Sequence, residues 1–138
     1  ADGDVCVATI LNGGITTIDG IRDHLPLLDG VMIGREAYQN PWFLLDIEQE
    51  ILGHARPGLT RETVARAMIP YMEEQHARHG TPLKSMTRHM IGLYQGQRGG
   101  RAWRRYLSEN AHLDGMTAAR LIAGALTAAE AKSLPRAA

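Results

Sequence analysis

The chain has 138 residues, of which 15 are basic and 15 are acidic, so its formal net charge is zero. A hydrophobic content of 44% and a charged content of 22% are typical of a soluble globular protein of one domain or two small ones. No apolar stretch approaches the roughly 18 residues of a membrane span, and no basic-then-apolar leader opens the chain. A single cysteine excludes an internal disulfide, and the six histidines lack metal-ligand spacing. We therefore expect a cytoplasmic protein with no membrane and no metal partner.

The first part of the chain alternates short apolar runs with longer amphipathic segments. Each apolar run is too short for a helix and ends at glycine, which indicates a strand buried on both faces of a parallel sheet. Threonine caps and an Asn-Pro pair mark the helix starts between them. We therefore predict βαβα order, with a strand over residues 5–11, a helix from Thr16 or Thr17 to about residue 27, a strand over residues 29–34 and a helix from Asn40-Pro41 to about residue 52.

Glycine turns follow both predicted strands. Asn12-Gly13-Gly14 follows the first strand, and Gly34-Arg35 follows the second. Because glycine lacks a Cβ, the backbone can approach an anion closely, and the first N–H groups of the next helix point at that anion. Two such turns after consecutive parallel strands match the phosphate site that (β/α)8 barrels build after their last strands. The spacing predicts a phosphate site with backbone donors at Gly13, Gly14, Gly34 and Arg35.

Arg35 is the cation of these turns and has two interpretations. Its guanidinium can pair with a bound phosphate, or it can be a structural counter-charge to Glu36 or Asp29. The sequence leaves both open.

After Arg56-Pro57-Gly58 the pattern changes to helices, which indicates a domain boundary. Thr60 and Thr63 are suited to begin the first helix, and Gly80 to end it. Short connections between helices predict a small bundle. The helices are expected over residues 60–80, 83–94, 100–110 and 117–132, the last with Leu121, Ile122, Ala125 and Leu126 as its buried stripe.

Charge is segregated along the chain. Residues 1–58 hold nine acids and three bases, whereas residues 59–138 hold six acids and twelve bases, and no acid occurs between Glu74 and Glu109. Such a stretch is typical of a polyanion-binding surface, although a solvated, arginine-rich face has the same composition. The bases inside the stretch are Arg78, Lys84, Arg88, Arg98, Arg101, Arg104 and Arg105.

Four blocks carry a resemblance to a known family: residues 12–15, 29–42, 88–94 and 100–108. In this order they resemble the C-terminal part of the tRNA-dihydrouridine synthases of the A type. The resemblance implies a flavin enzyme that reduces a D-loop uridine of tRNA to dihydrouridine, with FMN as cofactor and NADPH as its reductant. It also implies the last two β/α units of a (β/α)8, or TIM, barrel over residues 1–56 and a helical tRNA-binding domain over residues 59–138.

Site residues follow from the same resemblance. It implies that Asn12, Gly13, Gly14, Gly34 and Arg35 bind the FMN phosphate. Arg101 and Arg104 resemble the family's tRNA-contacting arginines. In the same helix, i, i+3 and i+4 spacing puts Arg105 on their face and turns Trp103 and Leu107 toward the core. The residues expected to bind tRNA are Arg101, Arg104, Arg105, Arg88 and Lys84.

The family's cysteine acid and its flavin-holding lysine and histidine have no counterpart in these blocks. Cys6 lies in the first predicted strand, where a small buried residue is ordinary. We therefore expect the 138-residue chain to be a fragment that is inactive alone, with open strand edges suited to pairing with a second copy. Two alternatives stay open: a non-catalytic RNA-binding helical module, and part of a different FMN-dependent barrel oxidoreductase.

Overall fold

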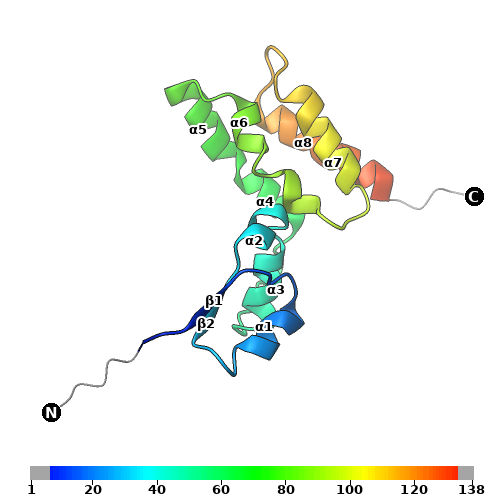
Figure 1. Cartoon of the computed structure of the whole chain (residues 1–138). Helices are drawn as coiled ribbons and strands as arrows, with labels where there is room; N and C mark the ends of the chain where they lie inside the picture. The colour runs from blue at the N-terminus through cyan, green and yellow to red at the C-terminus, as the bar shows by residue number, and fades with distance from the viewer. Residues whose placement is uncertain (1–6, 134–138) are drawn as a thin grey trace, which may run out of the picture. The chain divides into compact units, whose positions relative to one another are not determined.

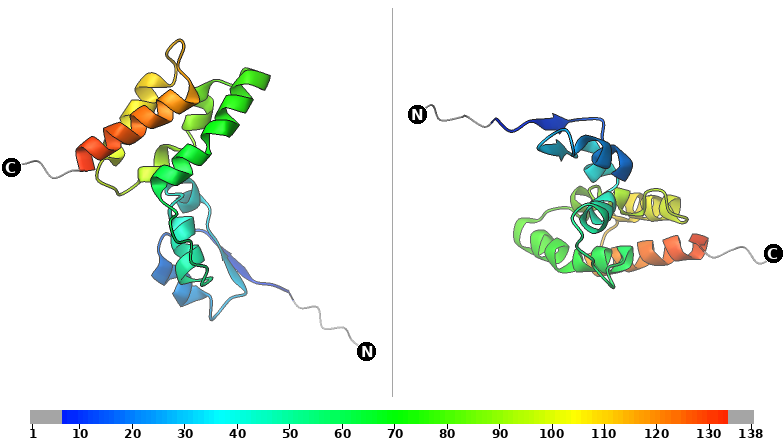
Figure 2. Two further views of the ribbon diagram at one scale, coloured as in Figure 1. Left: turned by 180° about the vertical axis from the view of Figure 1, so that it is seen from behind. Right: turned by 90° about the horizontal axis from the view of Figure 1, so that it is seen from below.

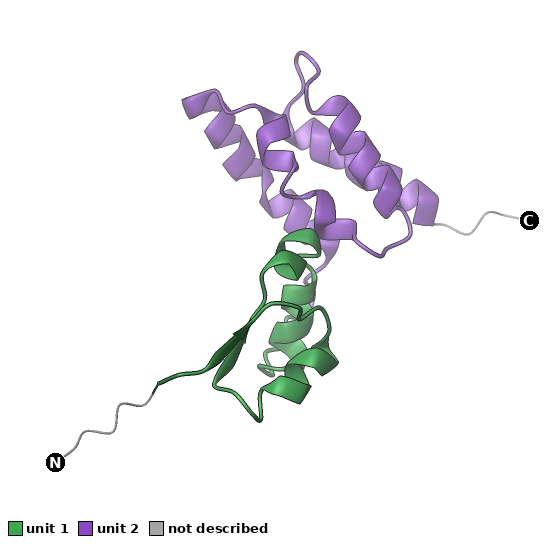
Figure 3. Cartoon of the chain, in the orientation of Figure 1, with its two compact units in different colours: residues 1–56 green, residues 57–138 purple. Residues whose placement is uncertain are grey.

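The computed structural model describes residues 7–133, which are mostly helical and contain one two-stranded sheet (Figure 1). The chain divides into two compact units between Arg56 and Pro57 (Figure 3). The first unit contains β1 (Ile10–Asn12), α1 (Ile18–His24), β2 (Gly30–Met32), α2 (Arg35–Gln39) and α3 (Phe43–Glu50). The second unit contains α4 (Arg61–Ala67), α5 (Ile69–His79), α6 (Leu83–Thr87), the 3-10 helix η1 (Ile91–Tyr94), α7 (Gly100–Asn110) and α8 (Ala118–Ser133).

β1 and β2 pair in parallel, as the alternation predicted, but each strand is only three residues long. Asp29 ends the ladder at its N-terminal side. Its carboxylate accepts a hydrogen bond from the Thr9 N–H at 2.7 Å, and its own N–H donates to the Thr9 carbonyl oxygen at 3.0 Å. Residues 7–9 therefore stay outside the strand, and the rest of the predicted first strand, including Cys6, lies outside the described residues.

Helices cover one face of this sheet. Since side chains alternate along a strand, Leu11 and Val31 share a face and pack with α1 and α3 on the cluster around Phe43. Ile10 and Met32 belong to the opposite face and are 61% and 45% exposed. The prediction that both strand faces are covered is wrong for the described residues, because α1 and α3 pack on the same side.

α1 begins as predicted and ends early. The Thr17 hydroxyl accepts the Gly20 N–H at 3.1 Å, which caps the helix. The helix stops at His24 because Pro26 has no N–H with which to continue the helical ladder, although Leu25 before it still has helical angles.

The predicted helix over residues 40–52 is present as the shorter α3, and a further helix that was not predicted, α2, precedes it. Asn40 and Pro41 lie in a turn before α3, in which the Asn40 carbonyl oxygen accepts the Phe43 N–H at 3.0 Å, and the helix begins at Phe43. Arg22 in α1 pairs with Glu50 in α3 at 2.9 Å and joins the two helices across their exposed ends.

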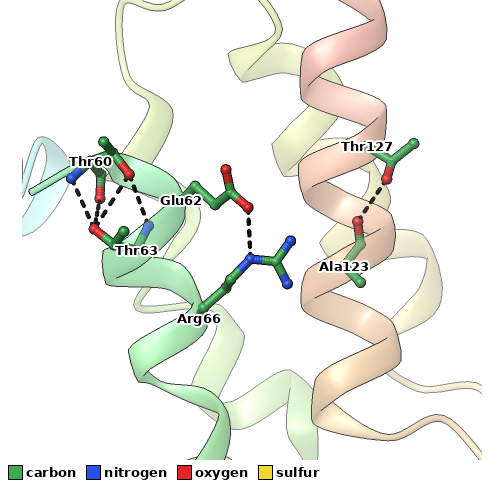
Figure 4. A network of polar contacts seen from close by, with 6 residues as sticks. All are labelled: Thr60, Glu62, Thr63, Arg66, Ala123 and Thr127. Carbon is green, nitrogen blue, oxygen red and sulfur yellow. Dashed lines mark hydrogen bonds and ion pairs between the residues drawn. The ribbon is translucent and has the colours of Figure 1, made fainter. Parts of the chain in front are cut away.

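The predicted helix over residues 60–80 is two helices. Thr60 and Thr63 form a reciprocal capping box, in which the Thr60 hydroxyl accepts the Thr63 N–H at 3.1 Å and the Thr63 hydroxyl accepts the Thr60 N–H at 2.9 Å (Figure 4). The break falls at Met68 because Pro70 has no N–H to continue the helical ladder. Gly80, with φ 64°, ends α5 as predicted.

The predicted helix over residues 83–94 also breaks. The Met90 carbonyl oxygen accepts the Trp103 indole N–H at 3.1 Å and the Leu93 N–H at 3.0 Å. α6 stops at Thr87, after which the His89 and Met90 N–H groups bond three residues back, to the carbonyl oxygens of Met86 and Thr87, and the 3-10 helix η1 follows.

α7 and α8 lie side by side, and their residues match the predicted ranges within one position (Figure 1; Figure 2). Trp103 and Leu107 are buried in the core, as predicted. The Trp103 ring lies 4.8 Å from that of Tyr94, centroid to centroid. The buried stripe of α8 contains all four predicted residues and also Ala118 and Ala129.

Candidate functional site

A pocket of about 440 Å³ lies at the carboxyl ends of β1 and β2. The glycine turns that follow the two strands meet there, because parallel strands end at the same edge of a sheet. All five residues predicted to bind phosphate line it. The complete lining is Asn12, Gly13, Gly14, Ile15, Thr16, Met32, Gly34, Arg35, Glu36 and Gln39.

The first turn has a backbone that only glycine adopts readily. Gly13 has φ 118° and Gly14 has φ 75°, and neither would bring a Cβ within 4 Å of another residue. Glycine is therefore favoured at these two positions by the positive φ angle and not by crowding, and the space beside both residues is open. The second turn leads through Gly34 into α2, whose first N–H groups have no partner within the helix.

Arg35 brings a positive charge to this pocket and forms no ion pair with any described residue. The two acids considered as its partners are engaged elsewhere. Asp29 accepts the Thr9 N–H, and the Glu36 carboxylate accepts the Asn40 side-chain N–H at 3.0 Å. The counter-charge interpretation of Arg35 is therefore wrong in this structure, and its guanidinium is available to an anion.

Other pocket residues were not predicted. Thr16 was considered only as a helix cap, a role that Thr17 fills. Gln39 lies one helical turn after Arg35 in α2, a spacing that would have placed both on one face had α2 been predicted. Glu36 adds a carboxylate to the rim, which opposes an anion, although its hydrogen bond to Asn40 holds one oxygen.

In the second unit, Arg101 and Arg105 line one hollow of the surface. Arg104 instead donates to the Gln95 side-chain oxygen at 3.3 Å. Arg105 also pairs with Glu109 at 2.8 Å, with side chains 75% and 58% exposed, and such a pair contributes little to stability. The three arginines predicted to share one helix face thus have different surroundings.

Some of the bases between Glu74 and Glu109 are paired with these two acids in the structure, so the surface of this stretch is less basic than its composition indicates. Arg78 at its start pairs with Glu74 at 2.9 Å, as Arg105 pairs with Glu109. Lys84 lies exposed in α6 without an ion pair to a described residue, and Arg88 donates to the His89 ring at 3.2 Å.

Within residues 7–133, no three His, Cys, Asp or Glu side chains gather as a metal site would require. The described helices include none with the length and apolarity needed to cross a membrane.

The family model for dihydrouridine synthase (Dus) matches residues 3–130. The chain belongs to the dihydrouridine synthase family. It is 54% identical over 105 residues to the tRNA-dihydrouridine(20/20a) synthase of Shewanella oneidensis, an alignment that covers 76% of this chain and 31% of that protein. Enzymes of the same name from Vibrio cholerae and Escherichia coli K12 are each 50% identical over 105 residues, which cover 76% of this chain and 32% and 30% of theirs.

The chain spans about a third of the length of the curated dihydrouridine synthases that it matches. All four blocks that carry the resemblance fall inside the family match, which confirms the membership predicted from them. In this dihydrouridine synthase chain the first two blocks include the turns of the pocket, and the last contains α7 with Arg101, Arg104 and Arg105.

Proposed function

We propose that this chain is the C-terminal portion of an FMN-dependent tRNA-dihydrouridine synthase. The parent protein would reduce a D-loop uridine of tRNA to dihydrouridine, with NADPH as the reductant of the flavin. Residues 1–56 would be the last two β/α units of the (β/α)8 barrel, and residues 59–138 the helical tRNA-binding domain. The observation that carries the proposal is the single pocket shared by the five residues expected to bind the FMN phosphate.

The donors of this pocket suit a phosphate. Gly13 and Gly14 hold a positive-φ turn beside open space, and Arg35 adds a guanidinium that no described carboxylate neutralises. A guanidinium can give two parallel N–H donors to phosphate oxygens. Flavin, when bound, supplies the hydride of the reduction, while these residues would anchor its phosphate and so fix the position of its ring.

The 138 residues contain one cysteine, Cys6, to which we assign no catalytic role. The chain alone would therefore bind tRNA without reducing uridine and would retain FMN weakly. The open edges of the two-stranded sheet would pair with further barrel strands or with a second copy. Family membership disfavours the alternative of a different flavin barrel.

Phosphate binding tests the pocket. Titration of the chain with inorganic phosphate, followed by amide NMR, should shift the Gly13, Gly14 and Gly34 signals saturably, and Arg35→Ala should abolish these shifts. Arg56→Ala is the matched control, because it removes the same charge from the same unit and disturbs only the exposed pair with Glu48. Shifts that persist in Arg35→Ala would remove the support for a phosphate site here.

Salt dependence of tRNA binding tests the second unit. If Arg101 and Arg104 each neutralise one phosphate that no other cation shares, replacing both with Ala should flatten the slope of log affinity against log salt by about 1.4–1.8. Leu121→Ala, in the buried stripe, is the control that lowers stability without changing this slope in the folded fraction. A double arginine variant with the parent slope would mean that this face is only solvated.

A further inference from the structure

A hollow of about 290 Å³ lies where α7 begins and α8 ends. Three of its five lining residues are cationic and none is acidic. Like charges gathered in one concave place repel one another and attract an anion from solution. The lining is Gly99, Arg101, Ala102, Arg105 and Lys132.

The two walls of this hollow are held together by contacts from distant parts of the chain. The Ser133 hydroxyl, at the end of α8, donates to the Arg98 carbonyl oxygen at 3.0 Å, just before α7. Gly99 packs so closely on the backbone of Ala129 that a Cβ would lie 2.8 Å from the Ala129 carbonyl carbon. These contacts hold the end of α8, which carries the exposed Lys132, against the start of α7.

The cations of the hollow remain available to a ligand. Arg101 and Lys132 form no ion pair with any residue that the structure describes. Arg105 pairs with Glu109, but both side chains are more than half exposed, so an incoming anion can replace that carboxylate at little cost. The start of α7, an 11-residue helix, adds the positive end of its dipole at the Gly99 side of the hollow.

We propose that this hollow clamps one phosphate of an RNA backbone, with Arg101 and Lys132 as joint ligands and Arg105 at the rim. Ala102 and the methylene stems of the cationic side chains offer an apolar surface for the adjoining ribose. The inference rests on the proposed tRNA binding and deepens it. It adds Lys132, which no sequence pattern singled out, and assigns Arg101 and Lys132 to the same phosphate.

If Arg101 and Lys132 share one phosphate, the affinity for tRNA should depend on salt in a distinctive way. Filter binding of unmodified tRNA to the full chain, across a salt series, would compare Arg101→Ala, Lys132→Ala and the double variant. If both cations serve one phosphate, either cation alone still neutralises it, so each single variant should keep nearly the parent slope and the double variant should flatten it by about 0.7–0.9. Two independent contacts would instead flatten the slope by about 0.7–0.9 in each single variant and by about 1.4–1.8 in the double variant.

Arg120→Ala is the matched control, because Arg120 is an exposed cation of α8 outside the hollow. Its slope should equal that of the parent, and circular dichroism should show all variants folded. A double variant with the slope of this control, or single variants that each flatten the slope, would overturn the clamp while leaving tRNA binding intact. A parent chain that binds no tRNA would overturn the clamp and the proposed function together.

Discussion

Gly99 and Gly80 offer a paired test of how the second unit is packed. Both have positive φ, 84° and 64°, so alanine at either position is strained by its own backbone. Their surroundings differ. A Cβ at residue 80 would meet nothing within 4 Å, whereas a Cβ at residue 99 would lie 2.8 Å from the carbonyl carbon of Ala129 in α8.

These geometries set the expected free energies. Alanine in the left-handed region costs about 1–2 kcal/mol, partly offset by about 0.4–1 kcal/mol from the lower entropy of the unfolded chain. Gly80→Ala should therefore destabilise by about 1 kcal/mol. Gly99→Ala must also displace the backbone of Ala129, whose carbonyl oxygen would lie even closer to the added Cβ than its carbonyl carbon does, and such overpacking adds about 1–3 kcal/mol or more.

Urea unfolding followed by tryptophan fluorescence would measure both variants. Trp42 belongs to the first unit and Trp103 to the second, so a Trp42→Phe background makes the emission report the second unit alone. This separation matters because two units need not unfold as one cooperative transition. If Gly99→Ala proved no less stable than Gly80→Ala, the close approach of α8 to the start of α7 would be refuted.

Two pKa predictions follow from named contacts. The hydrogen bond from Arg56 lowers the pKa of Glu48 below its ordinary 4.5, so the stability that this pair adds is present above pH 4.5 and is lost as pH falls through the lowered pKa. Arg56→Gln should return that pKa toward 4.5 in a carboxyl NMR titration, and an unchanged value would contradict the contact. Burial, with a smaller contribution from the Glu62 charge, raises the pKa of Tyr94 above 10.0. The stability that the neutral Tyr94 side chain adds to the fold is therefore complete below pH 10 and is lost as pH rises through the raised pKa. The difference in 295 nm absorbance titration between parent and Tyr94→Phe should have its midpoint above 10.0, and a midpoint at or below 10.0 would contradict the burial.

The features that could be predicted from sequence are those set within a few residues. A glycine turn after a short apolar run has its chemistry in adjacent positions, so Gly13, Gly14, Gly34 and Arg35 were identified and the structure brings them to one pocket. α8 was predicted for the same reason, since Thr117 caps it and its apolar spacing is regular.

The remaining features depend on residues far apart in the chain. Periodicity continues across Met68, so it hid the break that Pro70 causes. The turn between α6 and η1 is held by Trp103, whose indole N–H donates to the Met90 carbonyl oxygen 13 positions earlier. Lys132 reaches the arginines of α7 only through the packing of α7 on α8, which no local pattern contains.

The capping box of Thr60 and Thr63 has a consequence for how such chains can be assembled in evolution. Each threonine satisfies a backbone N–H of the other, so α4 needs no group from the sequence before residue 60 to begin. A recombination point between Arg56 and Thr60 would leave this helix start intact, whatever protein were encoded upstream. The segment from residue 57 onward is thus suited to fusion with a different upstream sequence, because its first helix supplies its own N-terminal hydrogen bonds.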